Sequence, residues 1–230
     1  MFSKYIQEMY PEDKKNTYPE KLCNFLTRSY LKDYTDKDIT FLDVGCGRGI
    51  QLKSFMKMLR GSFHGVDLEN PTIDGVKVVS CNLEKESLPY MDNFFDVIFT
   101  KSVIEHVSNT DNFIKEIYRT LKPGGTLIIM APDWQSQMLN FYDDYTHVKP
   151  FTIRSISSAL KINGFNNTRV TYFRQLPIVW KFKFLEVVCD IISFAFPESF
   201  KWKNQLDRNT KDRKWLRFSK EKMLLGVCKK

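Results

Sequence analysis

The sequence has few cysteines and no paired cysteine motif. The five thiols, an odd number without a C-x-x-C pair, are Cys23, Cys46, Cys81, Cys189 and Cys228. Small secreted scaffolds instead carry even sets of cysteines that form disulfide frameworks. We therefore expect free thiols and a reducing compartment.

Long apolar runs are also missing. No stretch reaches the roughly 18 to 20 apolar residues that a membrane-spanning helix needs. The first fifteen residues, MFSKYIQEMYPEDKK, lack the apolar centre of a signal peptide. With 43% hydrophobic and 27% charged residues among 230, the chain is expected to be a cytoplasmic α/β domain with an appendage.

The main part of the sequence has no excess of either charge. Residues 1–200 contain 24 Lys/Arg and 24 Asp/Glu, whereas the last thirty contain 11 basic and 3 acidic residues, which accounts for the net charge of +8. This basic end predicts an acidic partner, which could be a phosphate-bearing substrate, an anionic membrane surface or nucleic acid. A solvated basic surface without a partner is the alternative.

The pattern of apolar residues alternates between the periods of strands and helices. Strands are expected at 39–44, 62–66, 76–80, 95–100, 126–130, 169–173 and 223–227. Helices are expected at 22–30, 51–60, 111–121 and 152–162. This order predicts a doubly wound, Rossmann-like and mostly parallel sheet with helices on both faces, which binds ligands at the carboxyl ends of its strands.

Four regions follow from this pattern. Residues 1–36 are expected to form a helical cap along one edge of the sheet, and 37–175 the ligand-binding core. The core includes a long loop at 133–151, where an acceptor would bind. Residues 176–218 are expected to form a helical and basic insertion that acts as a lid, before the last strand in 219–230.

The stretch FLDVGCGRGI, at 41–50, has the spacing G-x-G-x-G and not the G-x-G-x-x-G of dinucleotide sites. Asp43 precedes the glycines, and its negative charge would oppose a phosphate but favour an ammonium group. Asp67 ends the next predicted strand, where a carboxylate can accept hydrogen bonds from both ribose hydroxyls. The two acids together predict S-adenosylmethionine as the ligand.

Four segments in this order resemble the class I S-adenosylmethionine-dependent methyltransferases over about residues 39–133. They are LDVGCGRG, GVDLEN, CNLEKESLPYMDNFFDVIFTKSVIEHV and FIKEIYRTLKPGGTLIIMAPD. The resemblance implies that Asp43 and the backbone of Gly45, Cys46 and Gly47 hold the methionine part of the cofactor. It further implies contacts of Asp67 with the ribose, and of Leu68, Asn82 and Leu83 with the adenine. Asn82 stands where the family usually has Asp, and its amide oxygen can accept the same hydrogen bond.

Lys101 follows the fourth predicted strand, so the resemblance places it near the sulfonium. A cation there is unfavourable unless it turns away, so Lys101 is a candidate to meet an anionic acceptor. A solvated loop lysine is the alternative. Methyl transfer depends mainly on alignment and exclusion of water, and needs a base only for a poor nucleophile such as a hydroxyl.

Three histidines are candidates for chemistry. His64 lies inside a predicted strand and is expected to be structural. His106 follows Glu105 in SVIEHV, and in the family this pair commonly supports a loop. Some relatives bind a metal through the pattern E-x-x-D/E-H. Here Ser102 occupies its first acidic position, so no metal is expected. His147, with Asp144 three residues before it, is the candidate base. The alternative is that these residues tie down the loop.

The segment DDYTHVKPFT, the aromatic region after residue 176 and the closing RFSKEKMLLGVCKK are similar to methyltransferases of bacterial surface-polysaccharide pathways. This resemblance implies O-methylation of a sugar or phosphate-linked group on a capsule or O-antigen precursor, which is an anionic small molecule or a lipid-linked glycan. Region 176–230 could then contact the membrane. The alternatives are a nucleic-acid or small-metabolite methyltransferase and a non-catalytic cofactor-binding scaffold. Nucleic acid is disfavoured by the neutral body.

Overall fold

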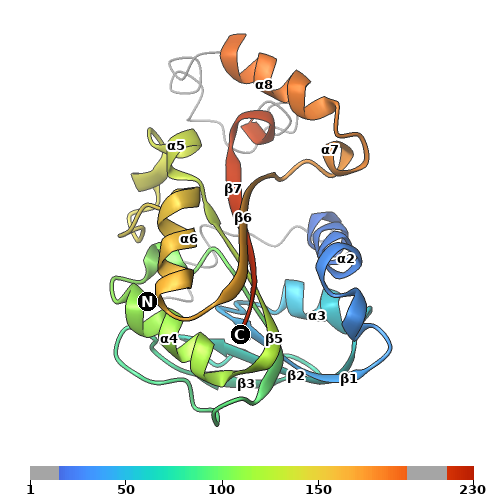
Figure 1. Cartoon of the computed structure of the whole chain (residues 1–230), viewed down its shortest axis with the longest axis vertical. Helices are drawn as coiled ribbons and strands as arrows, with labels where there is room; N and C mark the ends of the chain where they lie inside the picture. The colour runs from blue at the N-terminus through green and yellow to red at the C-terminus, as the bar shows by residue number, and fades with distance from the viewer. Residues whose placement is uncertain (1–15, 196–216) are drawn as a thin grey trace.

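The computed structural model describes residues 16–195 and 217–230. The first part of the predicted cap and much of the predicted insertion therefore lie outside the described residues. The rest forms a sheet with helices on both of its faces (Figure 1).

Seven strands form one sheet in the order β3–β2–β1–β4–β5–β7–β6. Their bounds are β1 Asp38–Val44, β2 Arg60–Asp67, β3 Lys77–Ser80, β4 Phe95–Lys101, β5 Leu121–Pro132, β6 Asn166–Arg174 and β7 Lys222–Lys229. The first five strands pair in parallel, and β7 is antiparallel to both β5 and β6. The carboxyl ends of β1, β4, β5 and β6 therefore lie at one edge, and the predicted doubly wound fold is confirmed.

The helices and short helical turns of the described chain connect these strands. They are α2 Tyr18–Tyr30, η1 Lys32–Tyr34, α3 Ile50–Met56, η2 Ile104–His106, α4 Thr110–Thr120, α5 Trp134–Gln137, η3 Phe141–Asp143, α6 Ile153–Ile162, α7 Pro177–Lys181 and α8 Leu185–Ala195. Buried residues of α2 and α3 pack on one face of the sheet. Those of α4 and α6 pack on the other face. The predicted cap helix thus covers a face of the sheet together with α3, and its expected place at an edge was wrong.

Two boundaries differ from the sequence prediction for local reasons. The predicted helix at 51–60 ends at Met56, because Arg60 already pairs with Asp38 in the sheet. The helix predicted at 111–121 does end there, at Thr120, but β5 begins at Leu121 and not at the predicted Thr126, because Leu121 pairs with Phe95 immediately after α4. The glycines produce an irregularity in the register there, not a break between helix and strand.

The helices α7 and α8 extend beyond the carboxyl end of β6, as the upper part of Figure 1 shows. Arg174, at the end of β6, is 2% exposed and anchors them. Its Nε donates to Glu186 at 2.8 Å, its Nη1 donates to the carbonyl of Ser219 at 2.6 Å, and its Nη2 pairs with Asp190. This position agrees with the predicted lid before the last strand.

None of the helices in the described ranges is long and apolar enough to cross a membrane.

Candidate functional site

The glycine loop joins β1 to α3 at the carboxyl edge. All three of its glycines have left-handed backbone angles, with φ of +76° at Gly45, +49° at Gly47 and +70° at Gly49. A Cβ atom at Gly45 would lie 2.2 Å from Val103, whereas one at Gly47 would meet no atom within 4 Å. Packing therefore excludes a side chain at the first glycine, and the second leaves open space beside the backbone where a ligand can approach.

The backbone N–H groups at the start of this loop are already hydrogen-bonded within the protein. Those of Gly45 and Cys46 donate to the carbonyl of Val66 at 2.7 and 3.1 Å. That of Gly47 donates to Asp67 Oδ2 at 2.8 Å. A pyrophosphate needs such N–H groups to be free, so this arrangement does not suit one. The loop can instead offer carbonyl oxygens, which accept hydrogen bonds from an ammonium group.

Asp67 and Asn82 both help to hold the backbone around the predicted nucleoside site. Asp67 Oδ1 accepts from the N–H of Leu68 at 2.8 Å, in addition to its bond with Gly47. Asn82 Oδ1 accepts from the N–H of Glu84 at 3.1 Å. Each of these oxygens has a second lone pair, so both residues keep acceptor capacity for a ribose or an adenine.

The two predicted adenine-lining leucines have different environments. Leu68 is 44% exposed and offers apolar surface to a ligand. Leu83 is 8% exposed and packs in the core beneath α4. A stacking contact is therefore expected from Leu68, while Leu83 supports the pocket from beneath.

Asp43 and Lys101 carry opposite charges at the ends of the adjacent strands β1 and β4. Asp43 is 3% exposed; its burial, with a further effect of Asp67, raises its pKa to about 8, although Lys101 opposes the shift. Burial also lowers the pKa of Lys101, against the charges of Glu105, Cys23 and Asp43. Lys101 is thus a half-buried strand residue among acidic groups, and its solvated alternative does not hold.

The turn η2 contacts the long loop after β5. The carbonyl of Glu105 accepts from the N–H groups of Val148 and Lys149 at 2.9 and 3.1 Å. Thr146 Oγ1 donates to Asp144 Oδ1 at 2.6 Å and lies 2.9 Å from His106 Nδ1. These bonds fix the loop against the end of β4, as expected if the cluster ties it down.

The imidazole of His147 is held in one orientation by the loop itself. Its Nδ1 lies 2.6 Å from the carbonyl of Phe141, which can only accept, so Nδ1 carries the proton and Nε2 keeps a lone pair. Asp144 Oδ2 lies 3.8 Å from Nε2, which is too long for a hydrogen bond, and the two groups form an ion pair only when the imidazole is protonated. The carbonyl of Phe141, and not the predicted partner Asp144, therefore orients the neutral ring.

The structure brings most of the predicted residues to one edge of the sheet. Asp43, the glycine loop and Asp67 lie at the ends of β1 and β2, and Lys101 connects them electrostatically to Glu105. Glu105 itself was not among the predicted site residues. It is 1% exposed, and its place in the short turn that follows the fourth strand was the sequence signal for it. His64 lies in β2 between aromatic rings, as expected for a structural histidine.

A shallow pocket of about 300 Å³ lies at the opposite edge of the sheet, around Asp33, Tyr34, Lys122 and Lys229. It contains none of the predicted site residues.

Comparison with known proteins agrees with this geometry. Residues 42–129 match the family model described as "Methyltransferase domain". The chain is 32% identical over 129 residues to the mitochondrial ubiquinone biosynthesis O-methyltransferase of Rattus norvegicus, a match that covers 46% of this chain and 36% of that protein. The chain spans only 28% to 38% of the length of three curated relatives that it matches.

Solved structures match over the whole chain. A SAM-dependent methyltransferase from Archaeoglobus fulgidus has a TM-score of 0.61 at 18% identity, with 100% of both chains covered. The Haemonchus contortus phosphoethanolamine N-methyltransferase 2, solved with S-adenosyl-L-methionine, has a TM-score of 0.61 at 16% identity, with 100% of this chain and 60% of that chain covered. Residues 42–129 therefore resemble a methyltransferase domain, and the whole chain has the fold of these solved methyltransferase structures.

Proposed function

We propose that this chain is an S-adenosylmethionine-dependent methyltransferase. The observation that carries the proposal is the glycine loop, whose N–H groups at Gly45, Cys46 and Gly47 are used internally. Carbonyl oxygens and the acid Asp43 remain for the ligand, and they favour the ammonium of the methionine part. Asp67 stands at the end of β2 for the ribose. The matching methyltransferase domain supports the same cofactor.

The methyl group goes, in this proposal, to an oxygen on a sugar or phosphate-linked group of a surface-polysaccharide precursor. His147 Nε2 has the lone pair that a base needs to take a hydroxyl proton. Tyr142 and Tyr145 of the same loop are 58% and 77% exposed and offer flat apolar faces for a sugar ring. The basic end of the sequence suits an anionic acceptor.

A lipid-linked acceptor would be reached at a membrane surface. Several apolar side chains of α8 and of the segment before it are more than half exposed, namely Phe182, Phe184, Val187, Ile191 and Phe194. The adjoining sequence is rich in Lys and Arg. Exposed apolar side chains beside basic ones favour anionic bilayers, so we propose such a bilayer as the surface that α8 contacts.

Vesicle co-sedimentation tests this contact. We expect binding to anionic but not neutral phosphatidylcholine vesicles, and loss of binding in Ile191→Ser/Phe194→Ser. The control Ile162→Ser removes a comparably exposed apolar side chain from α6 and should bind as the wild type does. Equal sedimentation of all three proteins would refute the proposed surface.

A free small metabolite is the second candidate acceptor. The names of several relatives refer to ubiquinone biosynthesis, to demethylmenaquinone or to phosphoethanolamine, and each of these compounds is a small molecule. The same lone pair at His147 and the same basic end of the sequence would serve a small phosphorylated hydroxyl compound.

Turnover separates these acceptors from the alternatives. The protein is incubated with S-adenosylmethionine and, in parallel, nucleotide-sugar pools, lipid-linked glycans, phosphorylated metabolites or bulk RNA, and products are identified by mass. A methylated sugar supports the proposal, while a methylated metabolite or RNA selects another acceptor. Cofactor binding without any turnover would favour the non-catalytic scaffold, and absence of cofactor binding would refute the whole assignment.

A further inference from the structure

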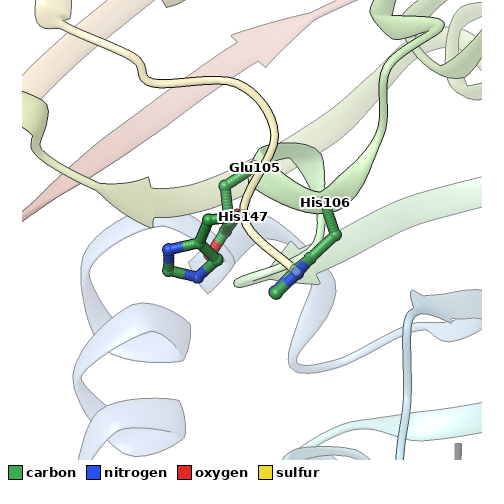
Figure 2. Close-up of side chains that lie close together, drawn as sticks. All are labelled: Glu105, His106 and His147. Atoms are coloured by element: carbon green, nitrogen blue, oxygen red, sulfur yellow. The ribbon is translucent and has the colours of Figure 1, made fainter. Parts of the chain in front are cut away.

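Three metal-binding side chains converge where the turn after β4 meets the long loop. Glu105 and His106 come from η2, and His147 comes from the loop that follows η3 (Figure 2). One ligand atom from each of these residues lies within 4.8 Å of the other two. The rings of His106 and His147 are 4.7 Å apart between their centres. The cluster is therefore assembled by tertiary structure from two separate segments.

Both imidazoles can present a lone pair on the same type of nitrogen. His147 Nδ1–H donates to the carbonyl of Phe141, which leaves Nε2 unprotonated. His106 Nδ1 lies 3.3 Å from the carbonyl of Thr146, and 2.9 Å from Thr146 Oγ1, whose proton goes to Asp144. His106 Nδ1 therefore also carries the proton. Metal-binding histidines usually donate their other ring N–H to a carbonyl or carboxylate in this way.

Glu105 supplies an unusual carboxylate. It is 1% exposed, and neither of its side-chain oxygens has a hydrogen-bond partner among the described residues. A buried carboxylate without partners is costly unless it binds a cation. A divalent ion would supply the charge that its surroundings lack.

We propose that Glu105, His106 and His147 form a binding site for Zn²⁺. Two nitrogens and one carboxylate oxygen are the donor set of open catalytic zinc sites, in which a fourth position stays free for water or substrate. Mg²⁺ prefers oxygen ligands, so this set does not suit it. In the E-x-x-D/E-H pattern the first position supplies an acidic ligand, and Ser102 occupies that position here. The third donor in this proposal is His147 from the distant loop, so Ser102 does not exclude a metal site.

The local geometry and charge are compatible with this ion. Zinc bonds of 2.0 to 2.1 Å place tetrahedral donors about 3.4 Å apart. The ligand atoms now lie within 4.8 Å of one another, so they need to approach by up to about 1.4 Å. The charged groups that act on Glu105 are Lys101 and Asp144. The net charge of these three side chains is negative when both acids are ionised, which favours a bound cation.

A bound ion would change the role of His147, and this consequence rests on the proposed function. With Nε2 bound to zinc, His147 is a ligand and not a base. The open position would bind the acceptor hydroxyl and lower its pKa directly. Metal binding itself does not depend on methyl transfer, so the two proposals can fail separately.

Metal binding is measured on the full chain without any acceptor. Purified protein is stripped with a chelator and titrated with Zn²⁺ alone against a chromophoric competitor, and with Co²⁺ alone by absorption spectroscopy. We expect one equivalent of each ion, with the intense visible bands of four-coordinate Co²⁺. We also expect Zn²⁺ to raise the melting temperature.

Variants decide whether the three residues hold the ion. His147→Gln, His106→Gln and Glu105→Gln should each weaken Zn²⁺ binding by more than about tenfold and abolish the Co²⁺ bands. Asp143→Asn, in the same loop, should bind as the wild type does. Circular dichroism shows which variants fold, and His147→Gln alone suffices if Glu105→Gln does not. No zinc binding by the wild type, or equal binding by His147→Gln, would overturn the proposal.

Discussion

Replacing Asp43 by Asn should stabilise the ligand-free protein while weakening its cofactor binding. An unfolded Asp has its ordinary pKa of 3.8, whereas burial raises that of folded Asp43 to about 8. Between these values the unfolded chain has released a proton that the folded chain still holds. The free energy of unfolding therefore falls as the pH rises from about 4 to about 8, and Asn removes this loss.

The size of the stabilisation by Asp43→Asn follows from the pKa shift of Asp43. Taken in full, a change from 3.8 to about 8 sets an upper limit of about 6 kcal/mol on what the charge costs at pH 8. Water penetration and relaxation around the ionised side chain recover part of this cost, so we expect Asp43→Asn to gain about 1–3 kcal/mol at that pH. Near pH 4 the two proteins should be equally stable. Urea unfolding across this range measures the difference, and a gain that does not depend on pH would refute the reasoning.

Cofactor binding should change in the opposite direction. The ammonium of S-adenosylmethionine stabilises ionised Asp43, so binding releases a proton and becomes tighter as the pH approaches 8. Asp43→Asn loses a charge-assisted contact worth about 1.5–3 kcal/mol, which weakens binding about 10- to 150-fold. The control ligand 5′-methylthioadenosine lacks the amino-acid part and should bind both proteins alike in calorimetry. Equal weakening for both ligands would contradict the placement of Asp43.

Three further substitutions test other parts of the structure. Gly45→Ala should destabilise the fold by at least about 1–2 kcal/mol because of its positive φ. Adding Val103→Ala should recover part of this loss, because it removes the side chain 2.2 Å from the new Cβ atom. If urea unfolding shows no recovery, Val103 does not exclude a side chain at Gly45. His147→Gln should lower kcat about 10²- to 10⁴-fold with unchanged affinity for S-adenosylmethionine, and full activity would exclude His147 from the chemistry. Arg174→Ala should lower the free energy of unfolding by about 1–3 kcal/mol, a loss that is limited because its partners Glu186 and Asp190 are half-exposed. It should also make α8 sensitive to protease. A variant as stable as the wild type would show that Arg174 does not anchor α8.

Local sequence signals predicted the fold well because they report on period and backbone angle. Glycines at 45, 47 and 49 marked a loop that needs positive φ, and the structure has positive φ at each. Element ends were less predictable. The helix before Lys122–Gly125 ends as predicted, yet these residues lie within β5, because pairing with β4 extends that strand back to Leu121.

The sequence by itself determined the fold class and the acids around the glycine loop, because these depend on short-range patterns along single strands and turns. Only the tertiary structure decided the state of the groups that carry the chemistry. It placed the half-buried Lys101 beside the buried Asp43, and within the described part of the chain it left the carboxylate of Glu105 without a hydrogen-bond partner. It also brought His147 beside His106 from a distant loop. The pKa values of these groups, and the ring nitrogens that keep a lone pair, depend on burial and on contacts between distant segments. Burial and such contacts do not follow from the order of residues along the chain.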